Sequence, residues 1–145
     1  MAARFLLDTN ICIYIRQRRP QAVLARFREL RPGDAVLSVI TYGELVYGAE
    51  KSQFREQARR QLAELAALIP VMELPMRAGE FYGSIRAALA AKGSMIGNND
   101  LWIAAHVMAE GLTLVTNNES EFRRIEGLEI ENWADSFERS TPRPV

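Results

Sequence analysis

Hydrophobic residues recur along this chain in short runs and in helical stripes that follow one another from end to end. Short apolar runs, which predict buried strands, lie at residues 5–7, 35–39, 71–74, 112–116 and 128–130. Stripes with the spacing of an amphipathic helix lie at residues 9–17, 20–30, 40–51, 54–69, 76–92, 101–110 and 121–125. Because the two kinds of segment alternate, the pattern predicts an α/β fold with a central parallel sheet of four to five strands and helices on both faces.

Glycines modify two of the predicted helices. Gly43 and Gly48 fall inside the helix at residues 40–51, where each weakens helix formation, so we expect another stretch of backbone to approach closely there. Gly93 follows the helix at residues 76–92 and is expected to be its C-cap.

The chain shows no internal repeat, low-complexity tract or linker that would divide it. Its 145 residues, of which 48% are hydrophobic, suit one domain with a single core. We expect residues 1–135 to form this domain and residues 136–145, which include Pro142 and Pro144, to be a loose tail.

Composition limits the classes of partner. Eighteen basic and eighteen acidic residues cancel, so a polyanion would need a local basic patch rather than the field of the whole molecule. The apolar run at residues 5–7 is too short for a signal peptide, and no later run approaches the length of a membrane span. We therefore expect a cytoplasmic protein without membrane association.

The single cysteine and the single histidine are both expected to be structural. Cys12 lies among isoleucines, as a small buried hydrophobe would, and a reactive thiol needs an electropositive, partly exposed setting. His106 is six residues from Asp100, which rotates it away from that carboxylate on a helix. Without that histidine, no Ser-His-Asp or Cys-His catalytic arrangement can be assembled.

Asp8 stands where the first predicted strand ends and the first helix begins. In an open parallel sheet, the carboxyl ends of the strands form the edge at which ligands bind. An alternative is that Asp8 only caps the helix, since aspartate is a favoured cap. Because Thr9 and Asn10 could serve as caps in its place, we interpret Asp8 as a functional acid.

Further acids and amides stand in unusual places. Glu44 lies in an otherwise apolar stretch of helix, and Asp100 stands at the start of an apolar helix. Asn118 and Glu121 follow the strand at residues 112–116, so they are expected at the same edge as Asp8. Taken singly, Glu44 suits a solvated helix face and Asp100 suits the positive end of a helix dipole.

Taken together, these groups predict a metal site. Carboxylates gathered in one place repel each other unless a cation neutralises them. Oxygen ligands without paired cysteines or histidines favour Mg²⁺ or Mn²⁺ over zinc. Such an ion activates water and offsets the charge of a phosphate, so the pattern indicates a hydrolytic metallonuclease.

An RNA substrate would also need cations and aromatic rings near the acids. Tyr14, Tyr47 and Trp102 are available for stacking on bases. Basic side chains fall near the predicted edge of the sheet, although each one alone suits an ordinary solvated face: Arg16, Arg18, Arg19, Arg86, Lys92, Arg123 and Arg124.

Four segments in this order and spacing resemble PIN-domain ribonucleases, specifically the VapC-type toxins of bacterial toxin-antitoxin pairs: residues 5–10, 41–49, 97–106 and 114–122. The resemblance covers nearly the whole chain. It implies a parallel sheet with flanking helices, Mg²⁺- or Mn²⁺-dependent endoribonuclease activity, a homodimer, and inhibition by a cognate VapB-type antitoxin. The implied substrate is structured RNA, with the anticodon loop of transfer RNA, and initiator transfer RNA in particular, as the expected target.

The resemblance also implies roles by position. Asp8, Glu44 and Asp100 match the acidic triad of the family, with Asp8 and Asp100 as the direct metal ligands. The chain departs from the family at the fourth position, where many members have an aspartate and this chain has Asn118. The fourth role is therefore open between Asn118 and Glu121.

Two other classes of function fit parts of the pattern. A phosphatase or phosphotransfer domain also places an aspartate after the first strand. The haloacid-dehalogenase type needs a second aspartate two residues later, where this chain has Asn10, and a receiver domain needs a lysine that residues 116–118 lack. A non-catalytic module that binds an antitoxin or RNA would not need the acid cluster.

Overall fold

The computed structural model describes residues 2–135, and this part contains five strands and seven α-helices. The strands are β1 (Phe5–Leu7), β2 (Ala35–Ser38), β3 (Val71–Met72), β4 (Thr113–Val115) and β5 (Ile130–Glu131). The helices are α1 (Thr9–Gln17), α2 (Gln21–Arg28), α3 (Val39–Glu50), α4 (Arg55–Leu68), α5 (Arg77–Lys92), α6 (Asn98–Glu110) and α7 (Glu119–Phe122), and a 3₁₀ turn, η1 (Trp133–Asp135), follows β5. The predicted tail at residues 136–145 lies outside the described residues.

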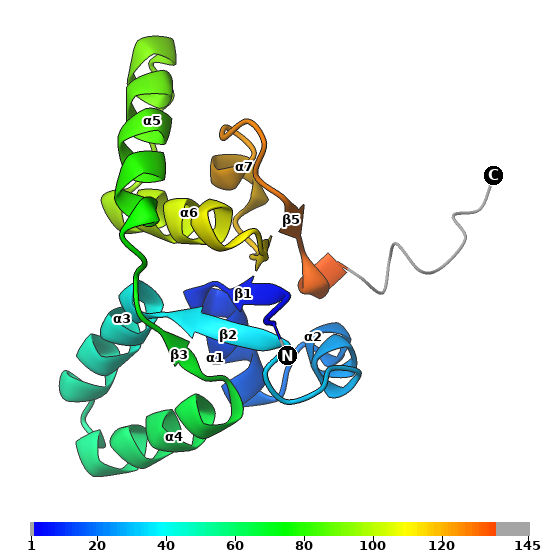
Figure 1. The fold of residues 1–145 in the computed structure, drawn as a ribbon. Helices are drawn as coiled ribbons and strands as arrows, with labels where there is room; N and C mark the ends of the chain where they lie inside the picture. Colours follow the sequence, from blue (N-terminus) through cyan, green and yellow to red (C-terminus); the bar gives the residue numbers. More distant parts are fainter. Residues whose placement is uncertain (1, 136–145) are drawn as a thin grey trace.

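All five strands pair in parallel, in the order β3-β2-β1-β4-β5. The chain starts in the middle of the sheet, builds β2 and β3 on one side, and then crosses to β4 and β5 on the other (Figure 1). The predicted α/β fold with a parallel sheet is confirmed. The strand order reverses between β1 and β4, and their carboxyl ends form the crevice in which such sheets bind ligands.

Both faces of the sheet are covered by helices (Figure 1). Leu6 and Leu114 belong to one apolar core with residues of α5, α6 and α7, whereas Leu7 and Val115 belong to a second core with residues of α1, α2 and α4. Successive strand side chains point to opposite faces, so β1, β2 and β4 each contribute to both cores. This double burial explains why the strands are continuous apolar runs in the sequence.

Two helix starts differ from the prediction by more than one residue. Helix α6 begins at Asn98 rather than at residue 101, and α7 begins at Glu119 rather than at residue 121. In both helices the first turn is polar, and a search for apolar periodicity cannot detect a polar turn. The earlier start places Asp100 inside the first turn of α6.

The expectation of a close backbone approach at two glycines of α3 is wrong. A Cβ atom added at Gly43 or at Gly48 would meet no atom within 4 Å. Gly93, by contrast, is the C-cap of α5 with a left-handed φ of 66°, as predicted.

None of the helices in residues 2–135 is both long enough and apolar enough to cross a lipid bilayer.

Candidate functional site

Asp8 follows β1 and begins the site. Its side chain is only 6% exposed, and each of its carboxylate oxygens accepts a hydrogen bond. Oδ1 accepts from the backbone N–H of Thr9 at 2.8 Å, and Oδ2 accepts from the hydroxyl of Thr116, which follows β4, at 2.8 Å. The carboxylate therefore joins the ends of the two strands at which the strand order reverses.

The interpretation that Asp8 is not needed as a helix cap is wrong. Asp8 is the N-cap of α1, and its bond to the Thr9 N–H satisfies one of the unpaired donors at that helix end. The partial positive charge of a helix N-terminus also favours a carboxylate. Capping leaves Asp8 free for a second role, because Oδ1 caps the helix while Oδ2 accepts from Thr116 at the end of the neighbouring strand.

Glu44 reaches the site from α3. The Thr9 hydroxyl donates a hydrogen bond of 2.8 Å to Glu44 Oε1, while the Thr9 backbone N–H binds Asp8. Thr9 thus links two acids that are separated by 36 positions in the sequence.

Asn118 and Glu121 are hydrogen-bonded to each other. Asn118 Nδ2 donates to Glu121 Oε2 at 2.9 Å, and the Asn118 N–H donates to the Thr116 hydroxyl at 2.9 Å. The same Thr116 hydroxyl donates to Asp8. Both candidates for the fourth position therefore belong to the hydrogen-bond network that includes Asp8.

Asp100 completes the group from the first turn of α6. Burial, a hydrogen bond with Glu121 and the charges of Asp8, Glu121 and Glu44 raise the pKa of Asp100 to about 7. Burial also raises the pKa of Asp8, against the hydrogen bonds from Thr116 and Thr9, and the charges of Glu44 and Glu121 raise it further. Glu44 and Glu121 thus lie close enough to influence the ionisation of Asp8 and Asp100.

The four acids stand apart from the ion pairs of the described residues. Among the ion pairs formed within residues 2–135, none includes Asp8, Glu44, Asp100 or Glu121. Within the same residues, no three Asp, Glu, His or Cys side chains are already placed to hold one metal ion together. The donors therefore do not form a complete protein cage, but they fit Mg²⁺, which often takes one or two carboxylates and keeps several waters.

His106 and Cys12 lie outside this network, as predicted. The His106 ring is fully buried, its Nδ1 is 2.9 Å from the Ser38 hydroxyl, and burial lowers its pKa. Cys12 is also fully buried, and burial raises the pKa of its thiol. Neither side chain is a candidate nucleophile or base.

Several side chains that were expected to contact RNA have partners within the protein. The Trp102 ring stacks on Tyr82 with ring centroids 3.9 Å apart, and Arg86 donates to the Tyr82 hydroxyl at 2.7 Å. Arg123 pairs with Glu119 at 2.7 Å. These contacts support the structure around α5, α6 and α7.

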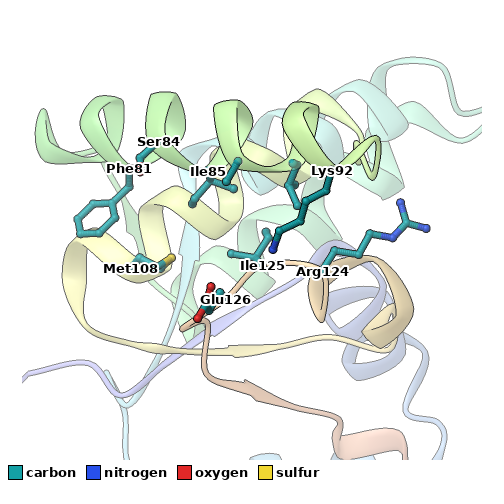
Figure 2. Close-up of a pocket in the computed structure, with 10 residues that line it drawn as sticks. Phe81, Ser84, Ile85, Lys92, Met108, Arg124, Ile125 and Glu126 are labelled. Carbon is teal, nitrogen blue, oxygen red and sulfur yellow. The ribbon is translucent and has the colours of Figure 1, made fainter.

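A pocket of about 310 Å³ opens between α5, α6 and the segment after α7 (Figure 2). Its walls are largely apolar, with Phe81 and Ile85 from α5 and Met108 from α6. Lys92 and Arg124 lie at one side of it in Figure 2, and Arg124 donates to the carbonyl oxygen of Met95 at 2.8 Å. None of the four acids lines this pocket, so it is separate from the acid cluster.

Sequence reasoning missed the two threonines that hold the cluster together. Thr9 and Thr116 are conspicuous only once β1 and β4 are known to be neighbours, with Leu7 opposite Val115. The residues that follow this pair are Asp8 and Thr116, and their side chains meet. A polar residue directly after each of two adjacent parallel strands is the signal that could have identified Thr116.

The fold and the acid cluster define a PIN-type nuclease domain, and the sequence agrees. The family model of the PIN domain matches residues 5–128. Ribonuclease VapC2 of Haemophilus influenzae is 41% identical over 130 residues, which are 90% of this chain and 98% of that protein. The tRNA(fMet)-specific endonuclease VapC of Shigella flexneri is 41% identical over 131 residues, with the same shares.

A solved structure, DNA-bound VapBC from Salmonella typhimurium, matches with a TM-score of 0.85 and 40% identity, covering 90% of this chain and 98% of that one. The chain therefore belongs to the VapC family of PIN-domain ribonucleases, which are hydrolases.

Proposed function

We propose that this protein is a divalent-metal-dependent endoribonuclease toxin that hydrolyses phosphodiester bonds in structured RNA. The observation that carries the proposal is a group of four acids at the strand-order reversal of the sheet, which form no ion pair with a basic side chain of residues 2–135. The name of the Shigella relative supports initiator transfer RNA as the substrate, and we place the cut in its anticodon loop. Loop bases are exposed, whereas those of an RNA helix are not.

In this proposal Asp8 and Asp100 hold Mg²⁺, or Mn²⁺ in its place. The bound ion lowers the pKa of water and offsets charge on the phosphate oxygens. Asp8 is oriented by Thr9 and Thr116, so little side-chain freedom is lost when it binds. Burial, the hydrogen bond with Glu121 and the nearby negative charges raise the pKa of Asp100, and such an ion would offset those charges.

Glu44 and Glu121 act on the attacking water. The Thr9 hydroxyl orients Glu44, and the Asn118 amide orients Glu121. A carboxylate held in this way can accept a proton from the water. The water oxygen then bonds to phosphorus, and the bond between phosphorus and the leaving ribose oxygen breaks. We assign the fourth position to Glu121 as the acid and to Asn118 as the group that positions it.

The decisive test compares the wild type with Asp8→Asn on initiator transfer RNA, with Mg²⁺ and with a chelator. We expect the variant and the chelator each to reduce kcat/KM by about a hundredfold or more, because even indirect partners of a metal site contribute about 10- to 100-fold. Glu80→Gln on the exposed surface of α5 is the matched control and should keep full activity. Full activity in Asp8→Asn, or in chelator, would contradict the proposal.

We also propose a VapB-type antitoxin and a second copy of the chain as partners. The Salmonella structure is a VapBC complex. Tyr47, Phe54, Leu68 and Met76 are large apolar side chains that are 65%, 69%, 61% and 95% exposed, and such side chains on α3, α4 and the start of α5 suit a surface that a partner covers. Sedimentation of the purified toxin tests the dimer, and a monomer at all practical concentrations would contradict it. Co-purification with the product of a neighbouring small gene tests the antitoxin.

A further inference from the structure

A second pocket lies beside the acid cluster, and we propose that it binds one nucleotide of the RNA next to the cleaved bond. The pocket has a volume of about 520 Å³, within the range of roughly 300 to 1,000 Å³ that ligand sites occupy. Its lining comes from the end of α1, the loop after β4 and the turn after β5: Tyr14, Gln17, Arg19, Pro20, Asn117 and Ala134. The inference rests on the proposed function, because it assigns a subsite to the same substrate.

One residue joins this pocket to the acid cluster. Asn117 lines the pocket, and its neighbours on either side belong to the cluster, since Thr116 binds Asp8 and Asn118 binds Glu121. When a phosphate of the RNA lies at the acid cluster, the nucleotide attached to it can therefore reach the pocket.

The wall of the pocket is held in place by hydrogen bonds. Asn117 Nδ2 donates to the Tyr14 hydroxyl at 3.0 Å, and Asn132 Nδ2 donates to Asn117 Oδ1 at 3.0 Å. The backbone N–H of Arg19 donates to the Tyr14 carbonyl at 3.1 Å, which fixes the chain where it leaves α1. A site whose side chains are already ordered loses less entropy when a ligand binds.

The chemistry of the lining suits a nucleotide. The Tyr14 ring offers a surface on which a base can stack, and such stacking is tolerant of base identity. The Arg19 guanidinium can pair with a phosphate, and the Gln17 amide can bond to a base edge. Among its lining residues that the structure describes are one cation, Arg19, and no acid, in contrast to the cluster beside it, so this lining suits the RNA strand.

Binding of a labelled anticodon stem-loop of initiator transfer RNA tests the pocket in the Asp8→Asn background, which leaves the RNA uncut. Tyr14→Ala should weaken binding about tenfold, the usual cost of losing one stacked base, and should lower kcat/KM of the otherwise wild-type enzyme by a similar factor. Tyr14→Phe keeps the ring and should keep most of the affinity. Glu80→Gln, on the exposed surface of α5, is the control and should bind as before.

Stem-loops that lack a single base at successive loop positions separate stacking from a structural role. We expect one abasic position at which Tyr14→Ala causes no further loss of affinity. An equal loss of affinity on every stem-loop in Tyr14→Ala would overturn the proposal. So would a Tyr14→Ala variant that binds the antitoxin more weakly but RNA as before. A protein that does not bind the stem-loops at all would overturn it too. Failure of the wild type to cut RNA with Mg²⁺ would refute the proposed function, while these binding comparisons would still decide the pocket.

Discussion

At the scale of single residues, the site depends on side chains with two partners each. The Thr116 hydroxyl donates to Asp8 and accepts from the Asn118 N–H. Thr9 donates to Asp8 through its backbone N–H and to Glu44 through its hydroxyl. The acids were predictable, because a charge inside an apolar stretch is visible in a sequence. The threonines were not, because a hydroxyl beside a strand is common and the acid that it contacts is distant in sequence, 35 positions away for Thr9 and 108 for Thr116.

Thr116→Val should reduce kcat/KM by about 10- to 100-fold, because it removes the donor that orients Asp8 and the acceptor for Asn118 at nearly constant volume. Thr116→Ser keeps the hydroxyl and should retain most of the activity. Steady-state kinetics over a range of Mg²⁺ concentrations is the measurement. Equal activity in the two variants would show that the hydroxyl does not orient the carboxylate.

The raised pKa of Asp100 predicts how stability changes with pH in metal-free protein. The folded chain keeps a proton on Asp100 up to about pH 7, whereas the unfolded chain releases it near 3.8. The folded state thus binds more protons between these values, so the free energy of unfolding falls as pH rises from about 4 to 7. Asp100→Asn should flatten this fall and stabilise the protein at pH 8 by about 1 kcal/mol. Urea unfolding in chelator at several pH values measures the free energy of unfolding. If this free energy falls with pH as steeply in Asp100→Asn as in the wild type, Asp100 is not the group that titrates.

At the scale of elements, the sequence predicted the presence and type of every strand and α-helix in the described part, but two helix starts were misplaced. Apolar periodicity reports which face of a helix is buried, so it is silent about the polar first turns of α6 and α7. It was likewise unable to tell whether the glycines of α3 were required by packing. That question depends on neighbouring atoms, and none lies near them.

Gly48→Ala should therefore raise the free energy of unfolding by about 0.5–1 kcal/mol, since the new methyl group meets open space and the helix gains propensity. Gly93→Ala is the matched contrast, because φ is 66° at this C-cap, and it should lower stability by about 1 kcal/mol. Thermal unfolding of both variants decides the matter. A loss of stability in Gly48→Ala would mean that α3 needs its glycine after all.

At the scale of the whole molecule, the sheet order decides which residues meet. The pattern predicted a parallel sheet, but nothing in it showed that β1 lies between β2 and β4, because strand order depends on how helices pack across the faces. The position of the site follows from that order. A chain with zero net charge thus concentrates four acids in one crevice.

Mg²⁺ should raise the melting temperature, because an ion that binds only the folded state stabilises it by linkage. The shift should be larger at pH 8 than at pH 5, since Asp100 is mostly protonated at the lower pH. Calorimetry across millimolar Mg²⁺ provides the measurement, with Asp8→Asn as the comparison. No shift at either pH would argue against a preformed site.

The bond between Thr116 and Asp8 has a consequence for when the site can form. Its two ends are 108 positions apart, and Glu121 comes later still, so the acid cluster cannot assemble until the ribosome has made most of the chain. On the proposed function, a shorter nascent polypeptide cannot cut the transfer RNAs that serve its own synthesis. Because the pairing of distant strands is slow, the proposed antitoxin then has this interval in which to bind before an active molecule forms.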